Sequence, residues 1–375
     1  MKAIAIEPGT TNVALIDVDE PQVSAPDEVK IKMLQVGICG TDREEVSGGR
    51  ADVPPGEKKL IIGHEMFGQV VDTGSAVTKV KKGDYGVFMV RRGCGQCKAC
   101  LAGRSDMCYT GAYTERGIKG ANGFQAQYVV DKERYLVKVP AEIKEIGVLT
   151  EPMSVAAKAI DEALIIQKAR LQDFEKEESW LEGKKALVAG IGAIGLMAAF
   201  ALRLRGATVV GLDVVDEGTR RPQLLKKIGG TYVDGRSVPV TSLDEVCGEV
   251  DFIFEATGVA EIEFELIDVL GTNGIYVATG IPGGNRPLTL EDASLMKQLV
   301  LKNGVMLGSV NASLHHFEVA VEDLAACLEK WPDEIRAVIT ERILYENFDA
   351  ALHNHSADEI KVTVQWSEPD EQLHT

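Results

Sequence analysis

The region between residues 184 and 284 alternates short apolar runs with helix-like stretches, and this alternation limits the possible folds more than any other feature. Strand-like runs lie at 184–190, 208–213, 251–258 and 274–284, and helix-like stretches lie at 194–206 and 222–230. Strands that alternate with helices build a parallel sheet covered by helices on both faces. We therefore predict an α/β fold with a doubly wound parallel sheet in this region.

A glycine motif joins the first of these strands to the first helix. Gly190, Gly192 and Gly195 form the pattern G-x-G-x-x-G around Ala193 and Ile194. The pattern alone is a weak signal, but a position between a strand and a helix is the context that a dinucleotide site requires. The glycines permit a tight turn and the close approach of a pyrophosphate, which faces the helix N-terminus. These five residues predict a Rossmann cofactor site.

An acidic residue, Asp213, ends the next strand after the glycine motif. A carboxylate at this place accepts hydrogen bonds from both ribose hydroxyls of NAD and repels the additional phosphate of NADP. The sequence therefore predicts a site that prefers NAD.

The first 150 residues have a different texture, with short β-like segments separated by Gly and Pro. These segments lie at 2–6, 28–38, 66–74, 84–90, 125–130 and 135–140, which suits an all-β, partly barrel-like domain. A helix is expected at 152–171, and the strand-like segment 359–366 is expected to return to the β domain. Because 375 residues exceed the size of one core, we predict a β-rich domain of residues 1–155 and 309–375 and a nucleotide-binding domain of residues 156–308.

The charge of the chain excludes some classes of partner. A formal net charge of −17 argues against nucleic-acid binding, which needs a basic surface. The N-terminal segment contains no apolar run of signal-peptide length, and no stretch approaches a membrane span. We therefore expect a cytoplasmic protein without a membrane partner. Thiols stay reduced in the cytoplasm, so clustered cysteines indicate metal ligands before disulfides.

Four cysteines lie close together in the segment RRGCGQCKACLAGRSDMC. Cys94, Cys97, Cys100 and Cys108 have the spacing C-x2-C-x2-C-x7-C. Four thiolates in a short loop suit a closed tetrahedral zinc site, in which the metal replaces a hydrophobic core. An iron–sulfur cluster and unrelated thiols are the alternatives. We predict structural zinc, which has no open coordination position for catalysis.

A second metal site is predicted from dispersed residues. Cys39 lies in VGICGTD, and His64 and Glu65 lie in IIGHEMFG. Each alone has an ordinary explanation, because a lone cysteine is usually a small hydrophobe and a lone histidine is usually just hydrogen-bonded. Together they are the side chains of an open catalytic zinc site. Glu151, at the start of the helix that leads to the cofactor domain, is then the additional carboxylate.

The order of these motifs resembles the zinc-containing medium-chain dehydrogenase/reductase superfamily over essentially the whole chain. Within it, the chain is similar to the archaeal-type glucose (aldose) 1-dehydrogenases. The resemblance rests on the segments GICGTDREEVSGG, GHEMFG, RRGCGQCKACLAGRSDMC, YTERGIKGANGF, EPMSVAAKAI and GSVNASLHHFEVAVEDL. The last three favour the sugar branch, and simple alcohol dehydrogenases typically have a cysteine ligand at the position of Glu151. The resemblance implies a GroES-like β-rich catalytic domain and a Rossmann domain.

The resemblance also implies roles for individual residues. Cys39, His64 and Glu151 would bind the catalytic zinc, and Glu65 would be a carboxylate able to enter the coordination sphere. Thr41 would lie beside the substrate oxygen, and Asp42 would orient His64. Glu115, Glu151 and Asn311 would contact the sugar. The segments expected to line the nicotinamide contain Thr279, Gly280, Ile281, Ser309, Val310 and Asn311.

The chain departs from its relatives at two places. Arg43 and Glu44 stand where many alcohol dehydrogenases have a relay histidine, so the proton must leave by another route. Val214 and Val215 stand where NADP-preferring sugar dehydrogenases have paired arginines, although Arg220 and Arg221 follow and make NADP a possible cofactor.

The resemblance finally implies an activity. We expect an NAD(P)-dependent enzyme with two zinc ions per chain that oxidises the anomeric hydroxyl of an aldose, D-glucose foremost, to the lactone. Polyol, threonine or alcohol dehydrogenases are alternatives with the same parts, and a noncatalytic zinc-stabilised binding protein is an alternative of another class. A homo-oligomer, dimer or tetramer, is expected because this fold commonly forms one.

Overall fold

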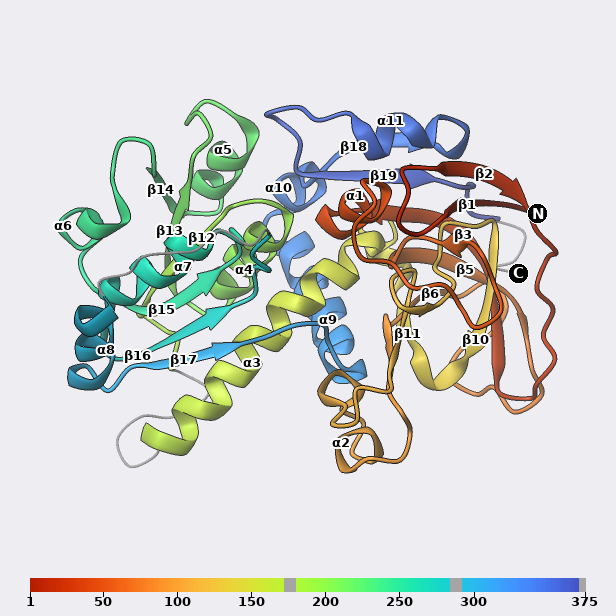
Figure 1. Ribbon diagram of the computed structural model, residues 1–375, viewed down its shortest axis with the longest axis horizontal. Coiled ribbons are helices and arrows are strands. Elements are labelled where there is room, and N and C mark those ends of the chain that lie inside the picture. Colours follow the sequence, from red (N-terminus) through yellow and green to blue (C-terminus); the bar gives the residue numbers. More distant parts are fainter. Residues whose placement is uncertain (172–179, 284–291, 371–375) are drawn as a thin grey trace. The chain divides into compact units, whose positions relative to one another are not determined.

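The chain forms two compact units in a computed structural model that describes residues 1–171, 180–283 and 292–370 (Figure 1). The β unit comprises Met1–Ser154, Asn311–Glu329 and Ile335–Thr375, and the α/β unit comprises Val155–Val310 and Lys330–Glu334. The domain limits expected from the sequence differ by one or two residues at the two crossings. They also differ at Lys330–Glu334, which groups with the α/β unit.

The α/β unit contains a six-stranded parallel sheet with the order β14-β13-β12-β15-β16-β17. The strands are β12 (Lys185–Ala189), β13 (Thr208–Asp213), β14 (Thr231–Asp234), β15 (Val250–Glu255), β16 (Leu270–Ala278) and β17 (Val305–Gly308). This order is that of two mononucleotide-binding halves, which places a ligand where the strand order reverses. The prediction of a doubly wound parallel sheet is confirmed.

The complete burial of the central strand β12 explains its continuous apolar sequence, from which the strand was predicted. Its residues Ala186, Leu187, Val188 and Ala189 are all completely buried, because both faces of the sheet are covered. The strands β14 and β17 escaped the sequence reading. Both are only four residues long, and β17 carries only half-buried and exposed positions, so neither has the length and burial of a central strand.

The helices of the α/β unit follow the expected alternation. They are the main part of α3 (Thr150–Leu171), α4 (Ala193–Leu204), α5 (Arg220–Lys227), α6 (Leu243–Cys247), α7 (Ala260–Glu265), α8 (Asp292–Leu301) and the start of α10 (Pro332–Ala337). Helix α4 begins directly after the glycine loop and packs on β12, β13 and β15. Helix α3, the long yellow-green helix of Figure 1, starts in the β unit and continues into the α/β unit.

A seven-stranded sheet organises the β unit. Its path is β11-β6-β5-β3-β19-β18, and β10 also pairs with β3. The strands are β3 (Glu28–Ile38), β5 (Glu65–Thr73), β6 (Tyr85–Phe88), β10 (Tyr128–Lys132), β11 (Leu136–Val139), β18 (Ile339–Leu344) and β19 (Lys361–Gln365). The antiparallel pairing of β19 with β3 confirms that the last strand returns to the β-rich part of the chain.

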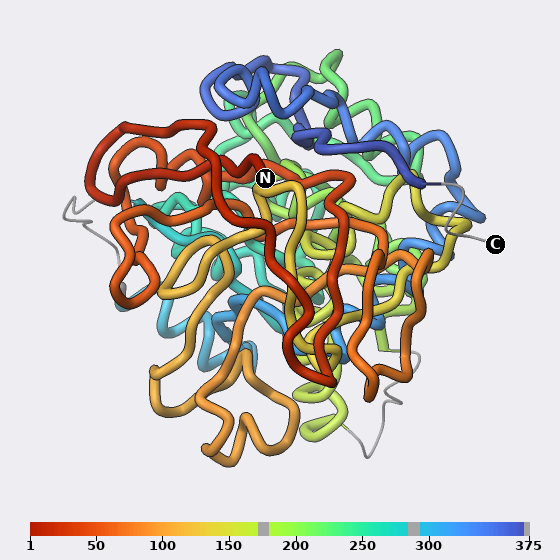
Figure 2. The backbone as a smooth tube through the Cα atoms, turned by 90° about the vertical axis from the view of Figure 1, so that its right-hand side faces the viewer, coloured from red at the N-terminus to blue at the C-terminus, as the bar shows by residue number. Residues whose placement is uncertain are grey.

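Smaller elements complete this unit. Two three-stranded sheets have the orders β2-β1-β4 and β7-β8-β9, built from β1 (Lys2–Ile6), β2 (Val13–Asp17), β4 (Leu60–Ile61), β7 (Arg91–Arg92), β8 (Thr114–Arg116) and β9 (Gly120–Ala121). The helices are α1 (Gly40–Val46), α2 (Lys98–Leu101), α9 (Leu314–Lys330) and α11 (Phe348–His353). In Figure 2 the N-terminal strands appear in red, and the segment that contains α2 forms an amber loop at the lower edge.

None of the helices in the described part of the chain combines the length and the apolar character needed to cross a membrane.

Candidate functional site

The start of helix α1 holds the first candidate ligand. Cys39 is the residue before the helix, and its Sγ accepts a hydrogen bond from the backbone N–H of Thr41 at 3.3 Å. The backbone N–H of Cys39 in turn donates to Oδ2 of Asp42 at 2.9 Å. The reciprocal bonds form a capping box, which fixes the Cys39 side chain. Thr41, two residues after Cys39, is half-buried.

Three candidate ligands of the dispersed site come together. Nε2 of His64 lies 3.1 Å from Sγ of Cys39. One ligand atom each of Cys39, His64 and Glu65 lies within 4.8 Å of the other two. Burial disfavours the charged form of His64, but the neighbouring Cys39 and Asp42 outweigh burial and raise the pKa of His64 well above its usual value.

The other ring nitrogen of His64 faces Asp42. Nδ1 of His64 lies 3.7 Å from Oδ1 of Asp42, and both atoms are buried without a hydrogen-bond partner within the described residues. Metal-bound histidines usually donate their second N–H to a carboxylate. The completely buried Asp42 therefore lies close enough to His64 to orient its ring when a metal is bound.

Glu65 has a partner that the sequence did not reveal. Nζ of Lys361 donates to both carboxylate oxygens of Glu65, at 2.6 and 2.7 Å, and to the carbonyl oxygen of Ile38 at 3.2 Å. Lys361 and Glu65 are each 1% exposed. Burial opposes the charge of Lys361, but Glu65 outweighs it and raises the pKa of the ammonium group. The lysine thus holds the Glu65 carboxylate at the edge of the cluster.

Glycine makes room for this carboxylate. Gly37 of β3 lies opposite Glu65 of β5, and a Cβ at Gly37 would stand 2.1 Å from Oε2 of Glu65. A side chain at this position would therefore displace Glu65 from Lys361.

Glu151 lies in the first turn of α3 and is 8% exposed. Burial and the charge of Glu65 raise its pKa to about 7. His64 and Lys361 act on it in the opposite direction. Glu151 therefore lies within electrostatic reach of the cluster, but it does not belong to the three residues whose ligand atoms lie within 4.8 Å of one another.

The donor set fits a catalytic zinc ion. Thiolate, imidazole and carboxylate are the ligands of open zinc sites, and the unpaired Nδ1 of His64 beside Asp42 is the second hydrogen bond that such a site uses. The residues that would hold zinc here are Cys39 and His64, with Glu65 or Glu151 as the carboxylate.

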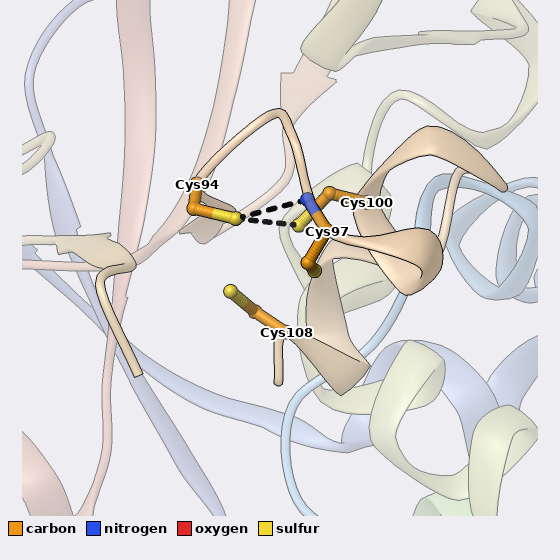
Figure 3. A group of neighbouring side chains, drawn as sticks. All are labelled: Cys94, Cys97, Cys100 and Cys108. Atoms are coloured by element: carbon orange, nitrogen blue, oxygen red, sulfur yellow. Dashed lines mark hydrogen bonds between the residues drawn. The ribbon is translucent and has the colours of Figure 1, made fainter. Parts of the chain in front are cut away.

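The four clustered cysteines face a common centre in Figure 3. One sulfur from each of Cys94, Cys97, Cys100 and Cys108 lies within 4.8 Å of the others, and all four thiols are free. A hydrogen bond with the hydroxyl of Thr110 lowers the pKa of Cys108 to about 6, which favours the thiolate that metals bind. The arrangement fits a closed tetrahedral metal site.

The lobe that carries these cysteines has almost no apolar interior. Leu101 is 73% exposed and Tyr109 is 78% exposed, whereas Ala99 is the buried apolar residue of α2. A metal ion is therefore the group that can hold this loop together.

The expected sugar contacts Glu115 and Asn311 touch each other. Nδ2 of Asn311 donates to Oε1 of Glu115 at 2.7 Å, although the two residues lie 196 positions apart. Asn311 has φ of 63°, a left-handed conformation that asparagine tolerates better than most residues. The same Oε1 accepts hydrogen bonds from Arg91, at 2.9 and 3.1 Å.

Close backbone packing brings the Glu115 loop to the His64 segment. A Cβ on Gly117 or on Gly123 would each lie 2.4 Å from the carbonyl oxygen of Gly63, the residue before His64. The backbone N–H of Phe124 donates to that same oxygen at 2.9 Å. The candidate sugar site therefore adjoins the candidate metal site within the β unit.

The glycine loop in the α/β unit has the shape of a phosphate cradle. A Cβ on Gly195 would stand 1.8 Å from the carbonyl oxygen of Gly190, which itself has φ of 81°. Gly192, in contrast, has no atom within 4 Å of an added Cβ, so the space above the turn is open. Ala193 and Ile194 form the first turn of α4, whose N-terminus suits a pyrophosphate. These residues fit a dinucleotide cofactor.

Asp213, the residue expected to bind the cofactor ribose, holds the glycine loop. Its Oδ2 accepts the backbone N–H of Ile191 at 3.0 Å, and its Oδ1 accepts that of Val214 at 2.7 Å. Nη1 of Arg221 lies 3.8 Å from Oδ2. A cation thus stands beside the carboxylate that was expected to repel the additional phosphate of NADP.

The segments expected at the nicotinamide are fixed by Glu255, which the sequence analysis missed. This buried residue ends β15, and its Oε1 accepts the backbone N–H of Thr257 and Gly258. Its Oε2 accepts the N–H of Gly280 at 3.2 Å, and its backbone oxygen accepts the hydroxyl of Thr279 at 2.6 Å. An acidic residue at the carboxyl end of a central strand was the available signal.

The second segment of this group is held by a buried lysine. Nζ of Lys158, which is 1% exposed, donates to the carbonyl oxygen of Val310 at 2.8 Å. Ser309 is buried and donates its backbone N–H to Ala278, whereas Ile281 and Val310 remain 57% and 49% exposed. Exposed apolar side chains beside an ordered backbone are suited to cover a ring.

Comparison with known proteins agrees with this arrangement. The family model described as Glucose dehydrogenase C-terminus matches residues 144–366, and the one described as Alcohol dehydrogenase GroES-like domain matches residues 25–141. A glucose 1-dehydrogenase of Methanocella arvoryzae is 37% identical, with 97% of this chain and 99% of the relative covered. A glucose 1-dehydrogenase of Haloterrigena turkmenica is 35% identical, with 98% and 100% covered.

A solved structure of Haloferax mediterranei glucose dehydrogenase in complex with NADP, Zn and gluconolactone is similar over the whole chain. Its TM-score is 0.88 at 30% sequence identity, with 98% of this chain and 100% of that chain covered. The matches define an α/β oxidoreductase with a GroES-like domain and a Rossmann-type sheet. The chain belongs to the glucose 1-dehydrogenase family of the zinc-containing medium-chain dehydrogenases, which confirms the resemblance seen in the sequence.

Proposed function

We propose that this chain oxidises the anomeric hydroxyl of an aldose, D-glucose foremost, to the lactone, with transfer of a hydride to NAD(P). The observation that carries the proposal is the Asn311–Glu115 contact, which lies next to the segment of His64. A sugar needs several fixed partners to present one hydroxyl among many, and buried polar groups reject substrates that would leave them unpaired. The glucose dehydrogenases similar to this chain agree with this substrate class.

The protein groups divide the work of the proposed reaction. Cys39, His64 and Glu151 would hold the catalytic zinc, and Glu65 would be able to enter its coordination sphere. Asp42 would orient His64. Bound zinc acts as a Lewis acid that lowers the pKa of a coordinated hydroxyl. Glu115 and Asn311 hold the sugar so that its anomeric carbon releases hydrogen as a hydride to the nicotinamide, while the hydroxyl releases a proton.

The proton route avoids Arg43. Nη2 of Arg43 donates to Oε1 of Glu359 at 2.7 Å, so this side chain is committed to an ion pair where other dehydrogenases have a relay histidine. We propose that the half-buried hydroxyl of Thr41 relays the proton, accepting it from the sugar hydroxyl as its own proton passes to solvent water. Its backbone N–H is fixed by Cys39, which holds the residue beside the metal ligands.

The cofactor proposal rests on the α/β unit. Gly190, Gly192 and Gly195 with Ala193 and Ile194 hold the pyrophosphate, and Asp213 binds the ribose. Thr279, Gly280, Ile281, Ser309, Val310 and Asn311 surround the nicotinamide. We propose NAD as the preferred cofactor because Asp213 lies at the strand end, with NADP accepted through Arg221, which stands 3.8 Å from that carboxylate.

Two zinc ions per chain are part of the proposal, with separable roles. His64→Ala should abolish turnover and leave the lobe metal in place, whereas Cys97→Ser should lower stability. Elemental analysis that shows iron, or no metal, in the purified protein would refute this assignment.

A homo-oligomer, dimer or tetramer, and a cytoplasmic location are proposed as well. The edge strand β17 and the exposed Met296, Val300 and Leu301 of α8 offer an apolar face for a second copy. All seven cysteines are free, which suits a reducing compartment.

An initial-rate screen of aldoses, polyols, threonine and simple alcohols with NAD and with NADP tests the function. We expect an aldose to give the highest kcat/KM and the product to be a lactone. Faster turnover of ethanol, threonine or a polyol than of every aldose would assign the chain to another dehydrogenase activity. No cofactor reduction with any substrate would indicate a noncatalytic protein.

A further inference from the structure

The side chain of Arg91 connects two parts of the β unit that the function above treats separately. Its Nε and Nη2 donate to Oε1 of Glu115 at 3.1 and 2.9 Å, and its Nη1 donates to the carbonyl oxygen of Asp106 at 2.7 Å. The Arg91 side chain is 8% exposed. The ring of Tyr113 lies 4.0 Å from its guanidinium carbon. All five guanidinium donors of an arginine have fixed directions, so these contacts define its orientation.

Asp106 belongs to the cysteine lobe. It lies in the short helical turn Ser105–Met107, immediately before Cys108. Its carboxylate is completely buried and accepts hydrogen bonds from Arg104, and the hydroxyl of Ser105 donates to the backbone oxygen of Arg91 at 3.4 Å. The turn that presents Cys108 therefore also fixes the position of Arg91.

Glu115 belongs to the candidate sugar site. Arg91 and Glu115 are opposite one another in the pairing of β7 with β8. Oε1 of Glu115 accepts three hydrogen bonds, two from Arg91 and one from Asn311. Oε2 accepts none from the described residues and is left to accept a hydroxyl. The arginine thus holds Oε1 of Glu115 and leaves Oε2 as the oxygen that can accept a substrate hydroxyl.

We propose that Arg91 is a positioning residue that links the fold of the cysteine lobe to the binding of the substrate. This inference rests on the proposed function of Glu115 as a sugar contact and deepens it. The lobe metal then has a role beyond stability, because loss of the lobe frees Nη1 of Arg91 and lets the guanidinium group turn away from Glu115. The affected quantity is substrate binding, because the residues proposed for the pyrophosphate and the ribose belong to the other unit.

The decisive experiment compares Arg91→Met, Arg91→Lys and Arg104→Met in the full-length, zinc-loaded protein. Arg91→Met is expected to raise the KM for the best aldose by about tenfold or more, as expected when a carboxylate loses charge-assisted hydrogen bonds. Such a tenfold rise corresponds to the loss of about 1.4 kcal/mol of binding free energy. The KM for the nicotinamide cofactor should change by less than about twofold. Arg91→Lys keeps the positive charge but not the paired guanidinium donors, so its aldose KM should lie between those of the wild type and Arg91→Met.

Arg104→Met is the matched control. It removes a lobe arginine with bonds to Asp106 but without any bond to Glu115 among the described residues. On the proposal it lowers the unfolding midpoint and raises the aldose KM much less than Arg91→Met does, because both bonds from Arg91 to Glu115 remain. An equal rise of the aldose KM in Arg104→Met and Arg91→Met would show that Arg91 acts only through general stability and would overturn the proposal.

A comparison of substrates distinguishes positioning of Glu115 from a general effect on stability, because a loss of stability alone would not change the preference among substrates. Among single-deoxy analogues of the aldose, the one that lacks the hydroxyl bound by Glu115 should be penalised in the wild type and in Arg104→Met. This penalty should shrink in Arg91→Met and in Glu115→Gln. If Arg91→Met does not fold, Arg91→Lys decides by the same comparison, and an unchanged penalty there refutes the inference.

Cys97→Ser tests the link to the lobe. We expect a higher aldose KM with an unchanged cofactor KM, and an unchanged aldose KM in a folded Cys97→Ser protein overturns the link. The failure of the proposed function is seen separately, in the wild type: a protein that oxidises no aldose refutes that function and this inference with it. A wild type that oxidises aldoses beside an Arg91→Met variant with normal KM refutes this inference alone.

Discussion

The replacement of Lys361 by methionine should destabilise the β unit more than any single surface change. Lys361 and Glu65 are both 1% exposed and meet through two contacts of 2.6 and 2.7 Å. Removal of one partner of a buried pair leaves an uncompensated charge and typically costs about 3–5 kcal/mol. For a unit of this size such a loss lowers the unfolding midpoint by roughly 6–20 °C, at about 2–4 °C per kcal/mol.

Thermal unfolding of the zinc-loaded protein followed by circular dichroism measures this loss. The double variant Lys361→Met/Glu65→Gln should recover a large part of it, because the second change removes the charge that the first left unpaired. Lys2→Met is the matched control, since the pair of Lys2 with Asp17 has 41% and 78% exposed side chains and such pairs contribute little. Equal midpoints for Lys361→Met and Lys2→Met would refute the reasoning, as would a double variant less stable than Lys361→Met.

Three further predictions concern other residues. Burial and the charge of Asp42 raise the pKa of Glu45 to about 9, so the folded state keeps a proton that the unfolded chain releases. The free energy of unfolding should therefore fall as pH rises from about 4.5 towards 9, by at most about 1.4 kcal/mol per pH unit. Glu45→Gln should remove this fall, and parallel stability–pH curves for the variant and the wild type would contradict the prediction. Arg221→Met should lower kcat/KM for NADP several-fold more than kcat/KM for NAD, because the cation beside Asp213 is lost. An unchanged ratio of the two kcat/KM values would show that Arg221 does not reach the phosphate. Asn311→Ala should weaken kcat/KM for glucose by about tenfold with normal zinc content and normal cofactor KM; a loss confined to cofactor KM would move Asn311 out of the sugar site.

The fold was predictable because its signals are local. The run 184–190 and the glycine motif specify a strand, a turn and a helix within a few neighbouring residues, and the structure contains each of them. The strands β14 and β17 were not predictable in the same way. Each lies at an edge of the sheet and is only four residues long, and β17 has only half-buried and exposed positions, so neither carries the signal of a buried strand.

The candidate site was predictable only in part, since its residues come from distant positions. The spacing of Cys94, Cys97, Cys100 and Cys108 indicates a metal site by itself, whereas the approach of Cys39 to His64 depends on the pairing of β3 with β5. The partners that fix the site were missed for the same reason. Lys361 lies 296 residues from Glu65, and Lys158 lies 152 residues from Val310, so no local pattern links either pair.

The position of β19 in the middle of its sheet has a consequence for biosynthesis. During translation, β3 and β5 leave the ribosome long before the strand that separates β3 from β18, because Lys361 follows Ile38 by 323 residues. The α/β unit, which is almost continuous in the chain, can fold meanwhile, as domains generally do on emergence. A nascent chain therefore carries the Glu65 carboxylate without its ammonium partner until synthesis is almost complete. Premature termination before residue 361 leaves a sheet with an open edge at β3, which is a substrate for chaperones and proteases and not a partly active enzyme.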